Sequence, residues 1–362
     1  MAHESQSREI RKKQKKKRSK KRIFFITLPF LIIILAVVGY AVNLYLKAEN
    51  AVSKSYEDTG REKSELREEV VDPTEDNISI LIIGVDTSEK RANDGNPRSD
   101  TLILATLNKH TNSVKLLSIP RDSYVYIPEV GYETRINAAH AYGGPKATIE
   151  TVENLLDVPV DYYVKLNFEA FIDVVDALDG VTIDVPFEFY EQNSKDEPKA
   201  IHLLPGVQEL DGEEALAFAR TRKIDNDIER GKRQQEVIKA VIKKAASAGS
   251  LFKYDDVIEA VGENMTTDLT FAEMRGLISY GLKGTLSIES MTLAGSDSWP
   301  NGAYYYQLDQ LALDETKEIL QEHLELNSTG SSNLTDSDTS NTDGTTDTTG
   351  YNDTNGTTDS DS

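Results

Sequence analysis

The sequence predicts an α/β domain in which helices cover both faces of a mixed central sheet, preceded by one membrane-spanning helix. Three observations support this prediction. Short apolar runs typical of strands alternate with segments of helical periodicity between residues 78 and 326. Two neighbouring runs are separated only by a short polar turn, which indicates an antiparallel hairpin. A long apolar run with a basic flank lies ahead of all these elements.

The N-terminal part of the chain is typical of a membrane anchor. Residues 1–22 are crowded with Lys and Arg, and residues 23–46 are apolar with few interruptions. Such a run is long enough to cross the hydrocarbon core of a bilayer and too long for the apolar part of a signal peptide. Because the basic flank comes first, the positive-inside rule predicts a single-pass protein of the cell membrane, with a cytoplasmic N-terminus and an extracellular remainder.

The rest of the chain divides by composition into three parts. Residues 47–76 are polar and charged, as expected of an extracellular linker. Residues 327–362 contain little besides Ser, Thr, Asn, Asp and Gly, so they have almost nothing to bury and we expect them to be disordered. Residues 77–326 are left as a single folded domain.

The charge and the absence of cysteine narrow the classes of function. The formal net charge is -21 at pH 7, which argues against a general nucleic-acid binder. Any site for an anionic ligand must therefore be built from a local group of cations. The chain has no cysteine, which excludes disulfides, thiolate metal ligands and cysteine nucleophiles. We find no Ser–His pair suited to covalent catalysis and interpret His140 and His202 as ordinary structural residues.

The first predicted strands lie at the start of the domain. Residues 78–85 are apolar on both faces, as in a central strand that is covered on both sides. Residues 101–107 and 114–119 are the two strands of the predicted hairpin. The later elements are strands over 162–166, 181–185 and 288–293 and helices over 147–156, 168–178, 255–264 and 270–280, the last opened by Asp268, with a terminal helix that ends near Leu326.

The hairpin brings charged residues to one end of the sheet. The start of its first strand lies beside the end of its second, so Arg98 and Asp100 should lie near Arg121 and Asp122. If the strand over 78–85 runs parallel to the second hairpin strand, its carboxyl end adds Asp86, at the edge where α/β sheets bind ligands. The carboxylates of Asp86 and Asp100 suit Mg²⁺, although a carboxylate pair beside arginines also fits a plain salt-bridge network.

Residues 211–235, DGEEALAFARTRKIDNDIERGKRQQ, concentrate arginines in an unusual way. Asp211 and Glu214 form a capping-box pattern at the start of a short helix that ends near Arg220. If the chain then continues in extended form, Arg220 and Arg222 point to the same side.

A second helix is predicted from Asp227. Its inward stripe is cationic at first, through Arg230, Arg233 and Gln234, and apolar later, so these residues should lie at the mouth of a pocket. Such a cluster fits a bound pyrophosphate, and it also fits a solvated face paired with nearby acids.

Several ordered blocks of the sequence resemble one family. At compatible spacing over residues 78 to about 245, the blocks are ILIIGVDTS, RSDTLILATLN, SVKLLSIPRDSYVYIP, RINAAHAYGGP, TVENLLDVPVDYYVKLNFEAFIDVVDALDGVTIDV, HLLPGVQELDGEEALAFARTR and ERGKRQQEV. Together with the basic head and single span, they resemble the LytR-CpsA-Psr family of cell-wall polymer ligases. So many blocks in one order make the resemblance far more specific than any single motif.

The resemblance implies an enzyme of the cell wall of Gram-positive bacteria. Members of the family transfer an anionic glycopolymer, such as teichoic acid or capsule, from an undecaprenyl-pyrophosphate carrier to the muramic acid C6 hydroxyl of peptidoglycan. The product is a phosphodiester. The implied cofactor is Mg²⁺, with Mn²⁺ as an alternative, and the implied partners are the lipid-linked glycan, peptidoglycan and the membrane, without nucleic acid.

The resemblance also carries site residues onto this sequence. Asp86 and Asp100 match the metal-binding aspartates and, with Arg98 and Arg121, the catalytic set. The residues that match the pyrophosphate-binding set are Arg98, Arg121, Arg220, Arg222, Arg230 and Gln234, with Arg233 as a further candidate. The usual Gly-Arg pair of the last motif is Glu229-Arg230 here, which keeps the arginine and changes the backbone beside it.

Two other classes of function remain open. One is a membrane-anchored regulator without catalysis, whose basic head contacts nucleic acid. The predicted topology and the position of the arginines in the outer domain argue against it. The other is a polyprenyl-pyrophosphate hydrolase, which would use the same site with water as the acceptor.

Overall fold

The computed structural model describes residues 52–86, 97–222, 227–247 and 264–326 except 283, with a few residues between 43 and 50. The predicted membrane span lies almost wholly outside these residues, and so do the predicted basic head, the tail over 327–362 and the helix over 255–264. None of the helices within the described ranges is long and apolar enough to cross a membrane.

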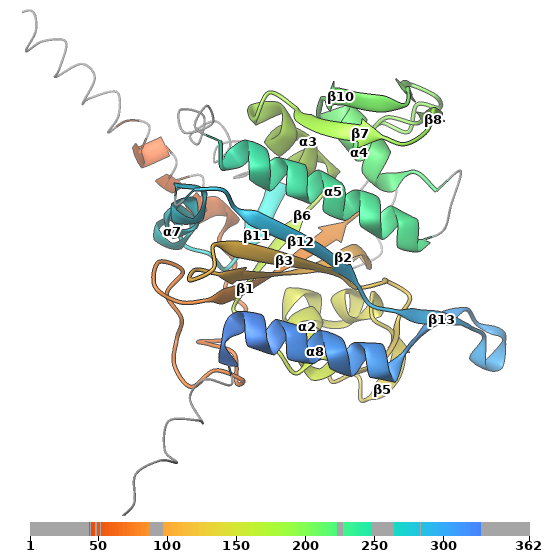
Figure 1. The fold of residues 1–362 in the computed structure, drawn as a ribbon. Coiled ribbons are helices and arrows are strands. Elements are labelled where there is room, and N and C mark those ends of the chain that lie inside the picture. The colour runs from red at the N-terminus through yellow and green to blue at the C-terminus, as the bar shows by residue number, and fades with distance from the viewer. Residues whose placement is uncertain are drawn as a thin grey trace, which may run out of the picture. The chain divides into compact units, whose positions relative to one another are not determined.

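A six-stranded mixed sheet forms the centre of the domain (Figure 1). In spatial order its strands are β11 (Met265–Thr267), β6 (Tyr162–Leu166), β1 (Ile78–Val85), β2 (Ser99–Asn108), β3 (Ser113–Ser118) and β12 (Ser287–Thr292). The predicted hairpin is confirmed, because β2 pairs with β3 in antiparallel fashion. Since β1 is also antiparallel to β2, it runs in the direction of β3, as the prediction required.

Helices cover both faces of this sheet (Figure 1). One face carries α2 (Ala138–Leu156) and α8 (Gln310–Leu324), and the other carries α5 (Asp227–Ala245) with α3 (Phe168–Ala177) and α4 (Gly212–Arg220) beyond it. The remaining helix, α7 (Phe271–Leu282), lies near one end of the sheet. The predicted fold class, a mixed sheet between helices, is therefore confirmed for the described part of the chain.

The apolar pattern of β1 explains its central position. Leu81 and Ile83 pack in the core cluster shared with α2 and α8, whereas Ile78 and Ile80 pack in the cluster on the opposite face. All four side chains are buried. A strand that buries both faces needs apolar residues at every position rather than at alternate ones.

Among the described residues, four two-stranded antiparallel sheets lie outside the central sheet. They are β4 (Tyr124–Ile127) with β5 (Tyr132–Arg135), β7 (Val181–Val185) with β10 (Gly206–Leu210), β8 (Phe189–Glu191) with β9 (Ile201–Leu203), and β13 (Gly295–Ser298) with β14 (Tyr305–Leu308). Of these eight strands the sequence analysis predicted only β7. Segments such as YETR and GSDS are short and polar, so they lack the apolar alternation that identifies a strand.

Two predicted helix starts differ from the structure. The helix predicted from residue 147 already begins at Ala138, because Gly143 and Gly144 interrupt its helical geometry just before Pro145 and hid the first turns. The helix α7 is capped by Thr270 rather than opened by Asp268. The Glu273 amide donates to Thr270 Oγ1 at 3.3 Å and the Thr270 amide donates to Glu273 Oε2 at 2.7 Å.

The segment predicted as a linker packs on the domain over its described residues 52–76. Arg67 donates through Nε to Asp161 Oδ1 at 2.9 Å and through Nη2 to Asp161 Oδ2 at 2.7 Å. The Asp161 side chain is only 2% exposed. Arg61 forms a second ion pair with Glu153 at 2.8 Å. The composition of the segment resembles a linker because it attaches through these charged side chains and only a few apolar ones, such as Val52 and Val71.

The last helix is fastened to the sheet by a buried histidine. His323 Nδ1 lies 2.8 Å from Thr106 Oγ1 on β2, and its Nε2 lies 2.8 Å from Ser113 Oγ on β3. Burial lowers the pKa of His323 to about 4, and Lys115 adds to the effect. The imidazole is therefore neutral in the folded state near neutral pH.

We predict that acid weakens the fold through His323. Its pKa is near 6.5 when unfolded and about 4 when folded, so between these values only the unfolded chain binds the proton. The stabilisation is complete above the unfolded value and is lost as the pH falls toward the folded one. In urea titrations at neutral pH and at about pH 5, His323→Gln should lose less free energy of unfolding than the parent. His202→Gln, at an exposed histidine, is the control, and equal losses in parent and His323→Gln would contradict the prediction.

Candidate functional site

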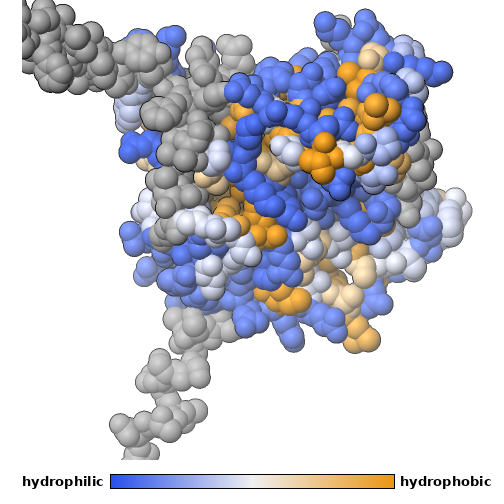
Figure 2. Space-filling model, turned by 45° about the horizontal axis from the view of Figure 1, so that its top comes forward, coloured by the Kyte–Doolittle hydropathy of each residue, from blue (hydrophilic) through white to orange (hydrophobic). Residues whose placement is uncertain are grey.

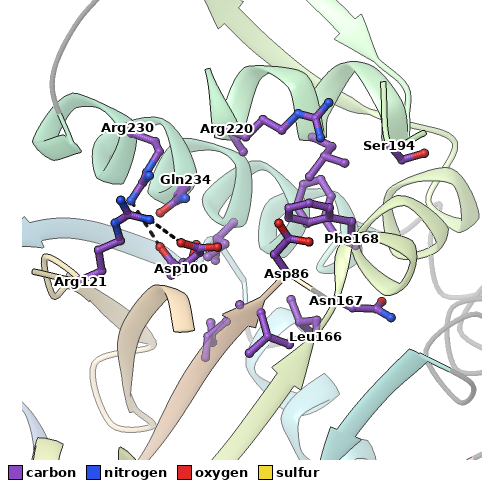
Figure 3. A pocket seen from close by; sticks show the side chains of 18 of the residues that line it. Asp86, Asp100, Arg121, Leu166, Asn167, Phe168, Ser194, Arg220, Arg230 and Gln234 are labelled. Atoms are coloured by element: carbon purple, nitrogen blue, oxygen red, sulfur yellow. Dashed lines mark hydrogen bonds and ion pairs between the residues drawn. The ribbon is translucent and has the colours of Figure 1, made fainter. Parts of the chain in front are cut away.

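A cavity of ≈ 580 Å³ opens at the carboxyl ends of β1 and β6. Its polar wall includes Asp86, Asp100, Arg121, Arg220, Arg222, Arg230 and Gln234. Its apolar wall includes Ile82, Val85, Leu166, Phe168, Phe171, Leu216 and Ile238. Figure 3 shows the labelled polar side chains around one space, with Asp86 and Asp100 entering from the sheet and the arginines from the helices and from the end of β3.

A β-bulge aims Asp100 at this cavity. Gly84 pairs with Thr101 and Val85 pairs with Ser99, so Asp100 is the extra residue on β2. A Cβ atom on Gly84 would lie only 2.9 Å from Thr101 Cβ, so a larger residue there would push the two strands apart. The bulge explains how two carboxylates on adjacent strands reach one space.

Arg121 is held by acids on three sides. Its Nη1 lies 2.5 Å from Asp100 Oδ1, and its Nε lies 3.5 Å from Asp122 Oδ2 and 3.8 Å from Asp227 Oδ2. Burial alone would lower the pKa of Arg121, but Asp227, Asp100 and Asp122 outweigh it and raise the pKa above its ordinary value. The guanidinium is therefore fixed at the edge of the cavity in its charged form.

Asp227 lies among the arginines, and the sequence analysis did not assign it to the site. Its Oδ1 is 2.9 Å from Arg230 Nη2 and 3.8 Å from Arg222 Nε. Burial raises the pKa of Asp227, against the opposing effect of Arg121 and Arg222. Both interpretations of the arginine cluster, a site for pyrophosphate and a group of arginines paired with acids, are therefore compatible. The arginines are paired with acids, and they still line the cavity. The spacing of Asp227 and Arg230, one helical turn, was the available signal.

Arg220 closes the other side of the cavity. Its Nη2 donates to the backbone oxygens of Gln192 and Asn193, the latter at 2.6 Å, and its guanidinium lies 5.8 Å from the centre of the Phe168 ring. Burial lowers the pKa of Arg220, against nearby acids. Thr221 is extended, and Arg220 and Arg222 both line the cavity. Their guanidinium groups have different partners, because that of Arg222 lies beside Asp227. The segment around Gln192, which also contributes to the wall, was missed because it carries no motif.

Arg233 and Arg98 do not line the cavity, although the sequence analysis assigned both to the pyrophosphate site. Arg233 is buried with its guanidinium on the end of α4, where it donates to Phe218 O at 3.2 Å and Thr221 O at 2.6 Å, and it is not among the residues that line the cavity. Arg98 is exposed and is likewise absent from the described wall. Arg233 therefore supports the helix end that presents Arg220 and Arg222, although the sequence assigned it to the pyrophosphate.

The start of α5 packs closely on the sheet. A Cβ atom on Gly231 would lie 2.8 Å from Ser118 Oγ, and Gln235 donates to Leu116 O at 2.8 Å and Met291 O at 2.5 Å. The neighbouring Arg230 and Gln234 face the cavity. This close contact fixes the height of both side chains above the sheet edge.

The donor chemistry of the cavity fits a hard divalent cation. Asp86 and Asp100 both line it, and within the described residues no group of three or more His, Cys, Asp or Glu side chains could hold a metal. A cation there would have two protein carboxylates and would complete its shell with water or ligand oxygens, which is the habit of Mg²⁺.

Most of the chain is similar to known proteins. The model of the LytR_cpsA_psr family matches residues 42–322. The chain is 41% identical over 325 residues to the polyisoprenyl-teichoic acid–peptidoglycan teichoic acid transferase TagT of Bacillus subtilis, covering 89% of this chain and 99% of TagT. It is 39% identical over 297 residues to the corresponding transferase TagU of the same organism, covering 81% and 93%.

Solved structures give the same relation. A structure of TagT bound to LIIa-WTA has a TM-score of 0.64 and 41% identity, covering 74% of this chain and 98% of that one. A structure of TagT with bound octaprenyl pyrophosphate lipid has a TM-score of 0.60 and 39% identity, with coverage of 74% and 98%. The resemblance seen in the sequence is thereby confirmed. The chain belongs to the LytR-CpsA-Psr family.

Proposed function

We propose that the protein is a phosphotransferase that moves an anionic glycopolymer of the teichoic acid type from a polyprenyl-pyrophosphate carrier to peptidoglycan. The observation that carries the proposal is the union of a cationic wall and an apolar wall in one cavity. A prenyl pyrophosphate has the same two parts, a compact polyanion and a hydrocarbon chain. The names of the relatives and the lipid bound in the TagT structure support this choice.

The cationic wall would bind the pyrophosphate. Arg121, Arg222 and Arg230 already meet at one carboxylate, that of Asp227, within 3.8 Å. A pyrophosphate offers several oxygens to planar guanidinium groups, which grip phosphate in pairs of hydrogen bonds. Gln234, one turn after Arg230, supplies a neutral donor in the same wall.

The apolar wall would hold the first isoprene units of the carrier. Leu166, Phe168 and Phe171 come from the end of β6 and the start of α3, and Leu216 and Ile238 come from α4 and α5. The prenyl chain of the carrier would thus have apolar residues on opposite sides. Each isoprene unit that leaves water makes the free energy of binding more favourable by about 25 cal/mol per Å² of apolar area that it buries.

The reaction is an attack by an alcohol on phosphorus. The oxygen of the acceptor hydroxyl forms a bond to the phosphorus that carries the glycan, the bridging P–O bond of the pyrophosphate breaks, and polyprenyl phosphate leaves. Arginines in the wall offset the charge that builds up on the phosphate oxygens. When held by Asp86 and Asp100, Mg²⁺ or Mn²⁺ supplies further positive charge to those oxygens.

The hydroxyl proton needs a carboxylate that reaches the acceptor. Asp86 and Asp100 line the cavity, whereas Asp122 is not among the described lining residues. Its carboxylate lies between Arg121 Nε at 3.5 Å and Arg135 Nε at 3.6 Å. Because they line the cavity, Asp86 and Asp100 are the carboxylates that we propose as acceptors of the proton.

The location in the cell is part of the proposal. A donor with a polyprenyl chain stays in the membrane, and peptidoglycan lies outside it. A single span ahead of the domain and a basic cytoplasmic flank, as the sequence of residues 1–46 indicates, would hold the cavity where both substrates meet. A regulator without catalysis has no evident use for a cavity of this composition.

Identification of the products separates the transferase from the hydrolase. We expect full-length protein in detergent, given Mg²⁺, a prenyl-pyrophosphate-linked glycan and peptidoglycan oligomers, to yield a glycan joined to the oligomer by a phosphodiester, because a held alcohol reacts faster than bulk water. Mass spectrometry of the products with and without oligomers is the measurement. Free glycan phosphate as the sole product with abundant acceptor would favour the hydrolase.

The metal proposal has its own test. Asp86→Asn and Asp100→Asn should raise the Mg²⁺ concentration for half-maximal transfer by about tenfold or more, because each removes one of two anionic ligands. Asp184→Asn, on the exposed side of β7, is the matched control and should behave as the parent. Magnesium titrations in which both variants overlay the parent would remove these residues from the metal site.

A further inference from the structure

The hairpin of β13 and β14 presents an exposed tryptophan. Trp299 precedes the short turn helix η2 (Pro300–Gly302), is 60% exposed, and is the only tryptophan of the chain. The Tyr304 ring lies beside it, with centroids 5.7 Å apart and planes at 57°. An exposed tryptophan beside a half-buried tyrosine is typical of a binding surface rather than of a core.

Polar contacts hold Tyr304 in place, and Trp299 packs on its ring. Tyr304 donates through its hydroxyl to Asp297 Oδ1 at 3.0 Å, and Arg135 Nε donates to Tyr304 O at 3.0 Å. The next residue, Tyr305, packs edge-on against Tyr124 with centroids 4.8 Å apart and lies under the Arg135 guanidinium at 5.3 Å. A surface that is fixed before binding loses little entropy when a ligand arrives.

The hairpin is joined to the candidate site. The Tyr306 amide donates to Asp122 O at 2.8 Å, beside a bridge between Ser123 and Tyr306. The Asp122 carboxylate lies between Arg135 and the cavity residue Arg121. Burial, Asp297, Asp122 and Asp227 together raise the pKa of Tyr304 to about 12, so the tyrosine hydroxyl also senses the site carboxylates. Tyr304 and its hairpin therefore lie near the mouth of the cavity.

The hairpin of β13 and β14 lies far from the described residues that follow the predicted membrane span. In Figure 1, β13 extends from the end of the molecule opposite to α7. The described residue Tyr45 packs on Phe271 of α7, with centroids 5.3 Å apart, so the N-terminal segment approaches the domain at that other end. This arrangement favours a ligand from the cell wall over the bilayer surface.

We infer that Trp299 and Tyr304 form a platform on which a glycan strand of the peptidoglycan acceptor docks. The inference rests on the proposed function, which requires a sugar hydroxyl to be held at the mouth of the cavity. A pyranose ring has a face of C–H groups that packs on an aromatic ring, and a rim of hydroxyls that hydrogen-bond. Asp297 and the Tyr304 hydroxyl supply polar partners at the edge of the platform.

Because Trp299 is the sole tryptophan, fluorescence excited at a wavelength that tyrosine does not absorb reports on the platform. Titrating soluble, uncrosslinked peptidoglycan glycan oligomers into the full-length protein in detergent should change the intensity or the wavelength of the emission in a saturable way. Calorimetry should show that Trp299→Ala weakens oligomer binding about tenfold, with Trp299→Phe in between. The control is Tyr56→Ala, which changes an exposed tyrosine that is distant from Trp299 in the sequence. This variant should bind the oligomers as the parent does.

The outcomes separate this inference from the proposed function. Binding that leaves the emission unchanged, binding that survives in Trp299→Ala, or no binding of the oligomers would each overturn the platform. If the oligomers bind at Trp299 and no phosphodiester product forms, the platform stands and the transferase proposal fails. In the transfer reaction, Trp299→Ala should raise the KM for the oligomer and leave the KM for the lipid donor unchanged.

Discussion

Mutual repulsion among guanidinium groups is the constraint on which the site depends. Arg121, Arg222 and Arg230 approach one another only because Asp227 lies between them, within 3.8 Å of each. Asp100 adds a second anion to Arg121 at 2.5 Å. Without these carboxylates the folded state would concentrate positive charge in a partly buried space, where electrostatic energies exceed those in water. A phosphate ligand can take over the same role because it too is an anion.

Residues around the arginine cluster position its charged side chains. The bulge at Asp100 directs a carboxylate to the cavity, Gly231 lets α5 approach β3, and Arg233 fixes the end of α4. On the face drawn in Figure 2, the surface is mainly hydrophilic with separate apolar patches. In an acidic chain, a group of cations that can hold a polyanion is thus collected at one sheet edge.

The sequence was informative where one physical rule decided the outcome. The apolar run of β1 and the hairpin after it fixed which strand ends meet, and so placed Asp86, Asp100 and Arg121 together. Helical periodicity placed Arg230 and Gln234 on the cavity side of α5. These inferences need only the two periods of regular secondary structure and the direction of neighbouring strands.

The remaining features depend on contacts between distant parts of the chain. The direction of Arg233 is set by carbonyl groups of α4, and the attachment of residues 52–76 is set by Asp161 and Glu153. The polar hairpins, including the one that carries Trp299, have no periodic signal. Asp227 was visible only as a helical neighbour of Arg230, and its place among three arginines needed the folded structure.

The central claim is that one cavity binds a pyrophosphate through its arginines and the attached prenyl chain through its apolar wall. The most direct measurement is a calorimetric titration of full-length protein with a short prenyl pyrophosphate, the matching monophosphate and the matching alcohol. The account predicts that affinity falls in that order, and that Arg230→Lys weakens the pyrophosphate about tenfold while changing the alcohol little, because lysine lacks the planar fork. Equal affinity for the three ligands, or a pyrophosphate affinity that Arg230→Lys leaves unchanged, would contradict it.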